Sequence, residues 1–255
     1  MKGFLRHPLR VTRRLFWFVG AALVAVFDFL SHSAFRRNNS ALAARALWLQ
    51  RHSRRALKIF GLQSQVIGPI PARGLLISNH LGYLDVLLLG AITPAVFVSR
   101  HDVRHWPVVG LLAQMAGTLF VDRERRVQVG QVNQEIQAVL DQGALVVLFP
   151  EGRSSNGHIV LPFKSSLLEP VVQTAHALSV SAIQYFVEDG DVSEDVCYSG
   201  DDAFFPHLLN LLGKRAVRAT VRFAPIPRTG ANRKQLAVQL RENILELKAD
   251  CSAGR

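Results

Sequence analysis

The sequence predicts an α/β fold with a mostly parallel central sheet flanked by helices, preceded by an N-terminal membrane-associated helical hairpin. From residue 75 onward, short apolar runs alternate with segments of helical length, the pattern of strands joined by helical crossovers. The first sixty residues differ, because a long apolar run there lies between basic clusters. We therefore expect two parts: membrane-associated helices over residues 1–60 and an α/β domain over residues 61–255.

The basic charge lies in the N-terminal part. The chain of 255 residues is 49% hydrophobic and has a net charge of +11. Residues 1–60 hold twelve basic side chains and one acidic side chain, whereas residues 61–255 carry eighteen of each sign. A groove for nucleic acid would spread its charge over the folded body, so we expect an anionic membrane surface and no nucleic acid as partner. The two cysteines, Cys197 and Cys251, suggest neither a disulfide nor a metal site and fit a reducing compartment.

The apolar run Leu15–Leu30 is interrupted only by Asp28. As a helix it reaches about 24 Å, short of the roughly 30 Å hydrocarbon core, so a dipping or re-entrant helix fits better than a span. A secretory signal is the alternative, but no small-residue cleavage site follows cleanly. Because basic clusters flank the run on both sides, we expect both ends at the cytoplasmic face of the inner membrane.

A second amphipathic helix is predicted over residues 40–61, from the N-cap Ser40 to a stop at Gly61. Basic side chains recur on one face with spacings of three and four, and apolar side chains line the other face. This pattern is typical of a helix lying on anionic lipid. The alternative is a surface helix packed on the protein's own core. The basic residues are Arg51, Arg54, Arg55 and Lys58.

The remaining chain supplies the strands and helices of the sheet domain. Strands are predicted at Leu75–Ser78, Ala95–Ser99, Thr118–Val121, Leu145–Phe149, Val180–Phe186 and Val217–Phe223. Helices are predicted at Leu84–Ile92, Val108–Ala116, Val127–Leu140, Leu167–Ala177, Phe204–Leu212 and Arg233–Lys248. Strands separated by helices in this way imply a largely parallel sheet that is covered on both faces.

Polar clusters follow three of the predicted strands. Asn79–Asp85 follows the first strand, Asp122 and Arg123 follow the third, and residues 151–157 follow the fourth across Pro150. The carboxyl ends of parallel strands meet at one edge of a sheet, where active groups collect. We therefore expect these three clusters to lie together.

His80 and Asp85 are the candidate catalytic pair. On a helix, a spacing of five separates two residues by about 140°, so His80 is expected in the turn before the helix, with Asp85 reaching back from an early turn. Asp85 would then fix the tautomer of the imidazole and stabilise the imidazolium that forms when the other nitrogen takes a proton. Because neither a G-x-S-x-G motif nor a nearby cysteine offers a nucleophile, the base would activate a substrate hydroxyl. Water in its place would give a thioesterase or lipid hydrolase, which is the alternative enzyme.

His101 and His105 have the i, i+4 spacing of a zinc-protease pair, with Asp102 between them. Pro107 disfavours a long helix through this segment, and no third ligand is evident. We therefore predict no metal site.

The three clusters resemble the sequence boxes of the glycerolipid acyltransferases, typified by 1-acylglycerol-3-phosphate (lysophosphatidic acid) acyltransferase. The family's N-H-x-x-x-x-D box is similar to residues 79–85. Its G-x-x-F-V-D-R box is similar to residues 117–123, and its F-P-E-G box matches residues 149–152. The likeness covers about residues 60–227.

The resemblance implies transfer of a fatty acyl group from coenzyme A or acyl carrier protein to the free hydroxyl of a lysolipid. Its default acceptor is 1-acylglycerol-3-phosphate, and a lysophospholipid or lyso-ornithine lipid is the alternative. His80 would be the general base and Asp85 its partner, with no cofactor besides the acyl thioester co-substrate and with membrane lipids as partners. Backbone N–H groups near the start of the helix would hold the oxyanion. The substrate-binding residues implied are Asn79, Arg123, Glu151, Gly152 and Arg153.

The chain departs from the family pattern at several positions. Arg153 stands where Thr is common, which adds a positive charge beside the acceptor head group. The family's V-P-V-type strand corresponds to residues 179–182 without its proline. A relative that binds lipid without turning it over is therefore a further alternative.

Overall fold

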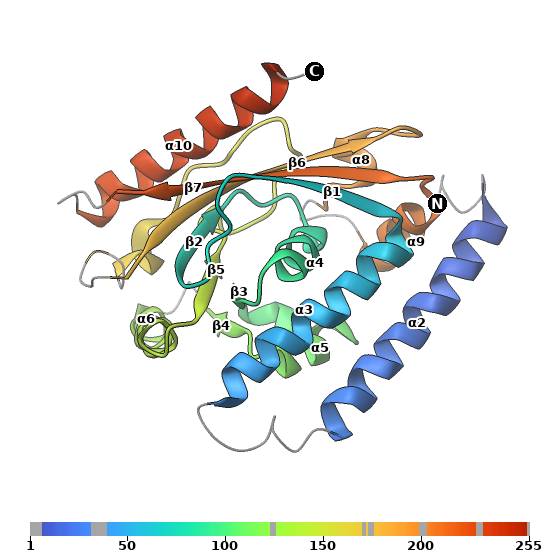
Figure 1. Cartoon of the computed structure of the whole chain (residues 1–255), viewed down its shortest axis with the longest axis horizontal. Helices are drawn as coiled ribbons and strands as arrows, with labels where there is room; N and C mark the ends of the chain where they lie inside the picture. The colour runs from blue at the N-terminus through green and yellow to red at the C-terminus, as the bar shows by residue number, and fades with distance from the viewer. Residues whose placement is uncertain are drawn as a thin grey trace.

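The computed structural model contains a seven-stranded sheet with helices on both faces and two N-terminal helices at one side (Figure 1). The structure describes residues 7–31, 40–122, 126–169, 172, 176–198, 203–227 and 232–253. The strands are β1 (Leu62–Ile67), β2 (Gly74–Ser78), β3 (Val96–Arg100), β4 (Leu119–Val121), β5 (Leu145–Leu148), β6 (Leu178–Val187) and β7 (Val217–Ile226). The helices are α2 (Pro8–Ser31), α3 (Ser40–Phe60), α4 (Tyr83–Ile92), α5 (Val109–Met115), α6 (Arg126–Asp141), α8 (Val192–Asp195), α9 (Phe204–Gly213) and α10 (Arg233–Ala253), with 3-10 turns at His101–His105 and Ser165–Leu167.

The sheet is mostly parallel, as the sequence predicts. Its order is β1-β7-β6-β2-β5-β3-β4. The strands from β6 to β4 run parallel to one another, whereas β7 is antiparallel to β6 and β1 is parallel to β7. The carboxyl ends of β2, β5 and β4 therefore point to one edge, where the three polar clusters begin.

Both faces of the sheet are covered by helices. Successive side chains of a strand point to opposite faces, so a strand that is apolar throughout contributes to the core on each side. All five residues of β2 are buried. Leu76 belongs to the core cluster that contains Leu88 of α4, whereas Ile77 belongs to the cluster that contains Ile136 of α6 and Leu240 of α10. Full burial of such a side chain contributes about 1.5–3 kcal/mol.

The N-terminal hairpin is formed by α2 and α3, and α2 is longer than expected. It has 24 residues rather than the sixteen of Leu15–Leu30, which corresponds to about 36 Å. The helix is long and apolar enough to cross a membrane by length and composition, so the expectation that it is too short is wrong. One side of α2 packs on α3: the Phe18 and Phe60 rings lie 5.6 Å apart, and the Trp48 indole donates to the Ala25 carbonyl at 3.1 Å.

The four basic side chains predicted on one face of α3 are exposed, and two of them also contact neighbouring helices. Arg51 Nη1 lies 3.1 Å from the Asp28 carboxylate of α2. Arg54 Nε donates to the Ala91 carbonyl at the end of α4, at 2.8 Å. The apolar face of α3 packs on the protein's own core, with Leu57 and Phe60 buried, and contact of its exposed basic face with lipid stays a prediction.

Two other elements differ from the sequence prediction. Residues 62–67 form β1 although no strand was predicted there, and four of its six residues are exposed. Of the helix predicted over Leu167–Ala177, residues 170, 171 and 173–175 lie outside the described residues, and its first residue ends the 3-10 turn Ser165–Leu167.

Candidate active site

Asp85 is the most heavily hydrogen-bonded side chain at the edge of the sheet. It is the third residue of α4 and is fully buried, at 0% exposure. Its Oδ2 accepts hydrogen bonds from the backbone N–H groups of Leu81 and Gly82, at 2.5 and 2.9 Å, and lies 2.8 Å from His80 Nδ1. Its Oδ1 accepts from the Tyr185 hydroxyl at 2.8 Å. The two oxygens of a carboxylate offer about four lone-pair sites, so the Asp85 side chain can accept all four of these hydrogen bonds at once.

This arrangement determines where the proton of His80 lies. Because Asp85 is an acceptor, the short contact requires that His80 Nδ1 carry the hydrogen, which leaves Nε2 with a free lone pair. The His80 ring stacks on Phe149 at a centroid distance of 4.2 Å, and its side chain keeps 21% exposure. The imidazole is therefore held in one orientation with one nitrogen able to act as a base. As expected from the sequence, His80 precedes the helix and Asp85 reaches back to it.

Tyr185 is a site residue that the sequence analysis missed. It lies in β6, one hundred positions from Asp85 in the sequence, and its hydroxyl donates to the Asp85 carboxylate. Burial raises the pKa of its hydroxyl well above the ordinary value, and the Asp85 charge adds to this effect. Tyr185 thus remains a hydrogen-bond donor. The signal in the sequence was a tyrosine at an inward position of a predicted strand, because a buried hydroxyl needs a partner.

Glu151 supports the loop that carries His80. It is 3% exposed, and its carboxylate accepts from the backbone N–H groups of His80 and Leu161, both at 2.7 Å. Burial raises the pKa of Glu151, and these two hydrogen bonds oppose that shift. Each oxygen of Glu151 already accepts one protein N–H, and the expected role in acceptor binding stays a prediction. Glu151 ties residues 79–80 to residue 161.

Asn79 is likewise buried and hydrogen-bonded to the protein. It is 1% exposed. Its amide donates to the Ile183 carbonyl at 3.1 Å and accepts from the Ile183 N–H at 2.8 Å, as one more residue of β2 would do. The side chain therefore joins the loop that carries His80 to β6, and the substrate-binding role of Asn79 stays a prediction.

The remaining predicted ligands occupy the loop after β5 and the segment after β4. Gly152 adopts a left-handed φ of 80°, and its N–H donates to the Phe149 carbonyl at 3.3 Å, closing a tight turn. Arg153 follows on the surface with an exposed guanidinium. Arg123 lies outside the described residues, so its role stays a prediction. The loop joins the His80 loop through the Ser155 N–H, which donates to the His80 carbonyl at 2.8 Å.

His101 and His105 lie in a 3-10 turn with ring centroids 5.5 Å apart. Among the described residues, no group of three or more His, Cys, Asp or Glu side chains could hold a metal ion. Asp102 is engaged by the Arg100 guanidinium through two contacts, at 2.9 and 3.0 Å.

The assembled site can take a proton from a neutral hydroxyl and stabilise the imidazolium that results. It lies beside a half-buried loop, residues 151–157, that carries the exposed side chain of Arg153. Two amides near the start of α4, those of Leu81 and Gly82, are directed at Asp85, and the binding of an oxyanion by amides in this region stays a prediction.

Comparison with known proteins gives consistent relatives. A sequence model described as acyltransferase matches residues 63–185. The lyso-ornithine lipid O-acyltransferase of Rhizobium meliloti is 32% identical over 225 residues, which is 82% of this chain and 77% of that protein. The enzyme of the same name from Pseudomonas aeruginosa is 34% identical over 185 residues, or 71% of this chain and 70% of that one.

Two further similar proteins are named as acyltransferases of a phosphate-containing acceptor. The 1-acyl-sn-glycerol-3-phosphate acyltransferase of Neisseria gonorrhoeae is 32% identical over 131 residues, which is 51% of each chain. The crystal structure of the 1-acyl-sn-glycerophosphate acyltransferase from Thermotoga maritima matches with a TM-score of 0.64 and 17% identity, and the match covers 97% of this chain and 98% of that chain. This last likeness shows a shared fold.

Proposed function

The chain belongs to the acyltransferase family and is a lysolipid acyltransferase, and from this premise we propose that it transfers a fatty acyl group from a thioester of coenzyme A or acyl carrier protein to the hydroxyl of lyso-ornithine lipid. The observation that carries the chemistry is the proton arrangement at His80. Nδ1–H is directed at a buried carboxylate, and Nε2 is left as a base on a partly exposed ring.

The acceptor is proposed from the extent of the similarity. The relatives named for lyso-ornithine lipid match over 77% and 70% of their length, whereas the Neisseria gonorrhoeae relative named for 1-acylglycerol-3-phosphate matches over 51%. The latter acceptor is the second candidate, because the identity of 32% is as high. Arg153 is the described cation best placed to meet either acceptor, since a guanidinium pairs with a carboxylate as well as with a phosphate.

In the proposed mechanism the transfer is direct. Neutral His80 Nε2 takes the proton of the acceptor hydroxyl while its oxygen attacks the thioester carbonyl carbon, and Asp85 stabilises the imidazolium. The tetrahedral intermediate then expels the thiolate, which receives the proton back from Nε2. Ester and free thiol are the products, and His80 returns to its starting tautomer. In this scheme Asn79 and Glu151 position the loop, and the α/β domain over residues 61–255 performs the reaction without a further cofactor.

We also propose that α2 holds the enzyme on the cytoplasmic face of the inner membrane. The large exposed apolar side chains of α2 are Leu9, Phe16, Trp17, Val19, Leu23, Val24, Phe27 and Leu30. The opposite side packs on the protein, with Val11 and Ala25 buried. A helix with one apolar face free and the other face packed suits the plane of the interface, where lysolipid and product reside.

The test is a reaction of the purified protein with one labelled acyl-CoA or acyl carrier protein thioester and a panel of lysolipids, with products identified by mass. We expect diacylated ornithine lipid as the main product and a loss of at least about 10²-fold in His80→Ala, the lower range for removal of a general base. Preferential acylation of 1-acylglycerol-3-phosphate would replace the proposed acceptor by the second candidate. Free fatty acid without acylated lipid would instead identify a hydrolase and contradict the proposal.

A further inference from the structure

A cavity of about 470 Å³ lies next to the catalytic loop and has no role in the chemistry described so far. Its walls are Leu81, the turn Asn156–His158, the start of α8, and Lys248 of α10, and its floor is formed by residues 183–187 of β6. The volume is within the range of sites that hold small-molecule ligands.

The cavity follows an open edge of β6. Beyond the end of β2, the amide group of Asn79 pairs with the N–H and C=O of Ile183, which shows that this edge faces away from β7. Because strand residues alternate, the N–H and C=O groups of Tyr185 and Val187 face the same way. In the described part of the chain, no loop, turn or cap hydrogen bond reaches these four groups.

The lining indicates that the cavity runs along the edge of the sheet rather than over one face. Side chains from both faces of β6 contribute to it: Ile183 and Tyr185 from one face, Gln184 and Phe186 from the other. An extended group lying there would take the place that a longer β2 would occupy. It would find backbone donors and acceptors repeating about every 6.6 Å.

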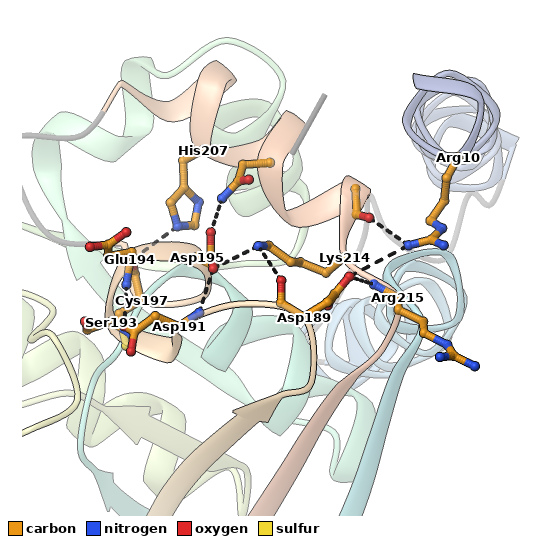
Figure 2. A network of polar contacts seen from close by, with 12 residues as sticks. Arg10, Asp189, Asp191, Ser193, Glu194, Asp195, Cys197, His207, Lys214 and Arg215 are labelled. Atoms are coloured by element: carbon orange, nitrogen blue, oxygen red, sulfur yellow. Dashed lines mark hydrogen bonds and ion pairs between the residues drawn. The ribbon is translucent and has the colours of Figure 1, made fainter. Parts of the chain in front are cut away.

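The outer wall is fixed by an ion-pair and hydrogen-bond network (Figure 2). Lys214 Nζ lies 2.8 Å from Asp195 Oδ2, which also accepts from the Asp191 N–H at 2.8 Å. Asp191 caps α8 by accepting from the Ser193 and Glu194 N–H groups. The outer wall, formed by the start of α8, is therefore held by contacts that do not involve the loop carrying His80.

We propose that this edge of β6 binds the pantetheine arm of the acyl thioester donor, which deepens the function proposed above and rests on it. The arm is extended, uncharged between its phosphate and its sulfur, and carries two amides joined by a β-alanine unit. That unit presents one N–H and one C=O, as one residue of an added parallel strand does, and matches the Tyr185 carbonyl and the Val187 N–H. Coenzyme A and acyl carrier protein share this arm.

The position of the cavity links the arm to the reacting atoms. Leu81, which lines the cavity, directly follows His80 and donates its N–H to Asp85. Tyr185 contributes its backbone to the edge and its hydroxyl to Asp85. A thioester entering along β6 thus arrives beside the base. The polar side chains around it are those of Asn156, Gln184 and Lys248. The Lys248 ammonium donates to the Gly157 carbonyl at 3.0 Å and the Gln184 amide to the Lys248 carbonyl at 3.2 Å, so the rim is polar and held in place.

The first experiment measures amide hydrogen exchange of the full-length protein without and with an S-alkyl-CoA, a thioether that cannot transfer its chain. We expect the amides of Tyr185 and Val187 to exchange at least about tenfold more slowly in its presence. An S-alkyl pantetheine, which lacks the nucleotide, should protect the same two amides. No protection, protection only with the nucleotide present, or protection by lyso-ornithine lipid instead would each overturn the proposal.

The second experiment measures KM for acyl-CoA and for acyl carrier protein thioesters. Val187→Pro removes the N–H of Val187, which faces away from β7. The fold should tolerate this change, because proline is accepted where the N–H of a strand residue faces away from its neighbouring strand. His158→Trp fills the cavity from its rim and serves if the proline variant does not fold. Both should raise KM for the two donors alike by about tenfold, a loss of about 1.4 kcal/mol of donor binding, and leave KM for the acceptor unchanged. Ile159→Trp, at an exposed neighbouring position outside the lining, is the matched control.

The outcomes separate this inference from the proposed function. A wild-type enzyme that acylates lyso-ornithine lipid but shows no protection at Tyr185 and Val187 disproves the donor site alone. Protection by S-alkyl-CoA in a protein that acylates another lysolipid supports the donor site and overturns the proposed acceptor. A rise of KM for only one of the two donors would assign the effect to its carrier rather than to the shared arm.

Discussion

The geometry at Asp85 explains why a single imidazole is prepared for base chemistry. Four donors surround its carboxylate, and two of them are backbone N–H groups of the turn that also carries His80. Hydrogen bonds to a charged group contribute about 1.5–3 kcal/mol each, so the turn, the tautomer and the start of α4 are stabilised together. The Phe149 ring then fixes the plane of the imidazole.

Tyr185→Phe tests the contribution of the donor from β6. The substitution leaves Asp85 Oδ1 buried without its donor, so the free energy of unfolding should fall by about 1–3 kcal/mol. We expect kcat to fall while KM for the acceptor stays unchanged, because Tyr185 acts through Asp85. Tyr83→Phe is the matched control, since the Tyr83 hydroxyl is also buried but contacts His207 Nδ1 at 3.0 Å. Equal losses of kcat in both variants would assign the effect to general destabilisation.

Glu151→Gln tests whether this carboxylate binds the acceptor or supports the loop. One of its two backbone partners, the N–H of His80 or of Leu161, would then face an NH₂ group, so the loop should shift and kcat should fall with little change of acceptor KM. A large rise of acceptor KM alone would support the binding role.

The same variant has a pH signature. Burial raises the pKa of Glu151 above its ordinary value of 4.5, so the folded state holds the proton more tightly than the unfolded chain does. The stability that this group contributes is fully present below 4.5 and is lost as pH rises through its folded pKa. The unfolding free energy of wild type relative to Glu151→Gln should therefore decrease with rising pH above 4.5, as measured by denaturant titration. An increase would contradict the shift.

At this scale the sequence predicts the pair His80 and Asp85, because a motif of fixed spacing implies a local turn. It does not predict which carboxylates and amides are buried. Glu151 and Asn79 stand in motif positions and were expected to contact substrate, yet their partners come from residues 161 and 183. Contacts between segments so far apart depend on the register of the sheet, which local patterns do not reveal.

At the scale of elements, α2 is joined to α3 by a polar cluster of Asp28, Arg51 and His52, the Asp28 cluster. Asp28 interrupts the apolar run of α2, and its Oδ2 lies 2.8 Å from His52 Nε2 and 3.1 Å from Arg51 Nη1. Trp48 packs beside the His52 ring at 5.1 Å. The single acidic residue of the N-terminal part thus pairs the two helices.

The Asp28 cluster predicts that the stability of the folded protein depends on pH. Burial lowers the pKa of His52 from 6.5, although the hydrogen bond to Asp28 opposes this effect. The unfolded chain therefore takes up the proton first. The stability that His52 contributes is present above 6.5 and is lost as pH falls through its folded pKa. His52→Gln should remove this part of the decline in thermal melting temperature below pH 6.5, whereas His105→Gln at an exposed site should not. Identical profiles for the two variants would rule out the assignment.

Element prediction succeeded where apolar residues form a short continuous run and failed where a strand has no such run. The buried strands β2 and β5 are short apolar runs and were predicted. The exposed edge strand β1, with the sequence LQSQVI, lacks such a run and forms because it pairs with β7. The basic spacing on α3 was read as a lipid-binding face, although Arg51 and Arg54 satisfy acceptors on α2 and α4. Helical periodicity gives the face of a side chain but not its partner.

At the scale of the whole molecule, α2 is attached near one end to α9 of the α/β domain and near the other end to α3. Arg10 Nη1 donates to the Gly213 carbonyl at 3.0 Å, and Arg14 Nη1 donates to the Leu212 and Lys214 carbonyls at 3.2 and 2.5 Å (Figure 2 shows Arg10). These are carbonyls at the end of α9, where cations are stabilised by the helix dipole. Asp28 fastens the other end to α3. A helix attached in this way cannot cross the bilayer without drawing α3 and α9 into it.

This attachment predicts that both ends of α2 lie on the same side of the membrane. In a background where Cys197 and Cys251 are replaced by serine, single cysteines at His7→Cys and Ser31→Cys would report the two ends. In sealed inside-out vesicles, which expose the cytoplasmic face, a membrane-impermeant maleimide should label both positions to the extent reached after detergent is added. A spanning helix would leave one of them protected until the vesicles are opened. Although 24 residues suffice for a span, the packed side of α2 would then have to exchange its protein contacts for lipid, and labelling decides between these arrangements because it depends on topology alone.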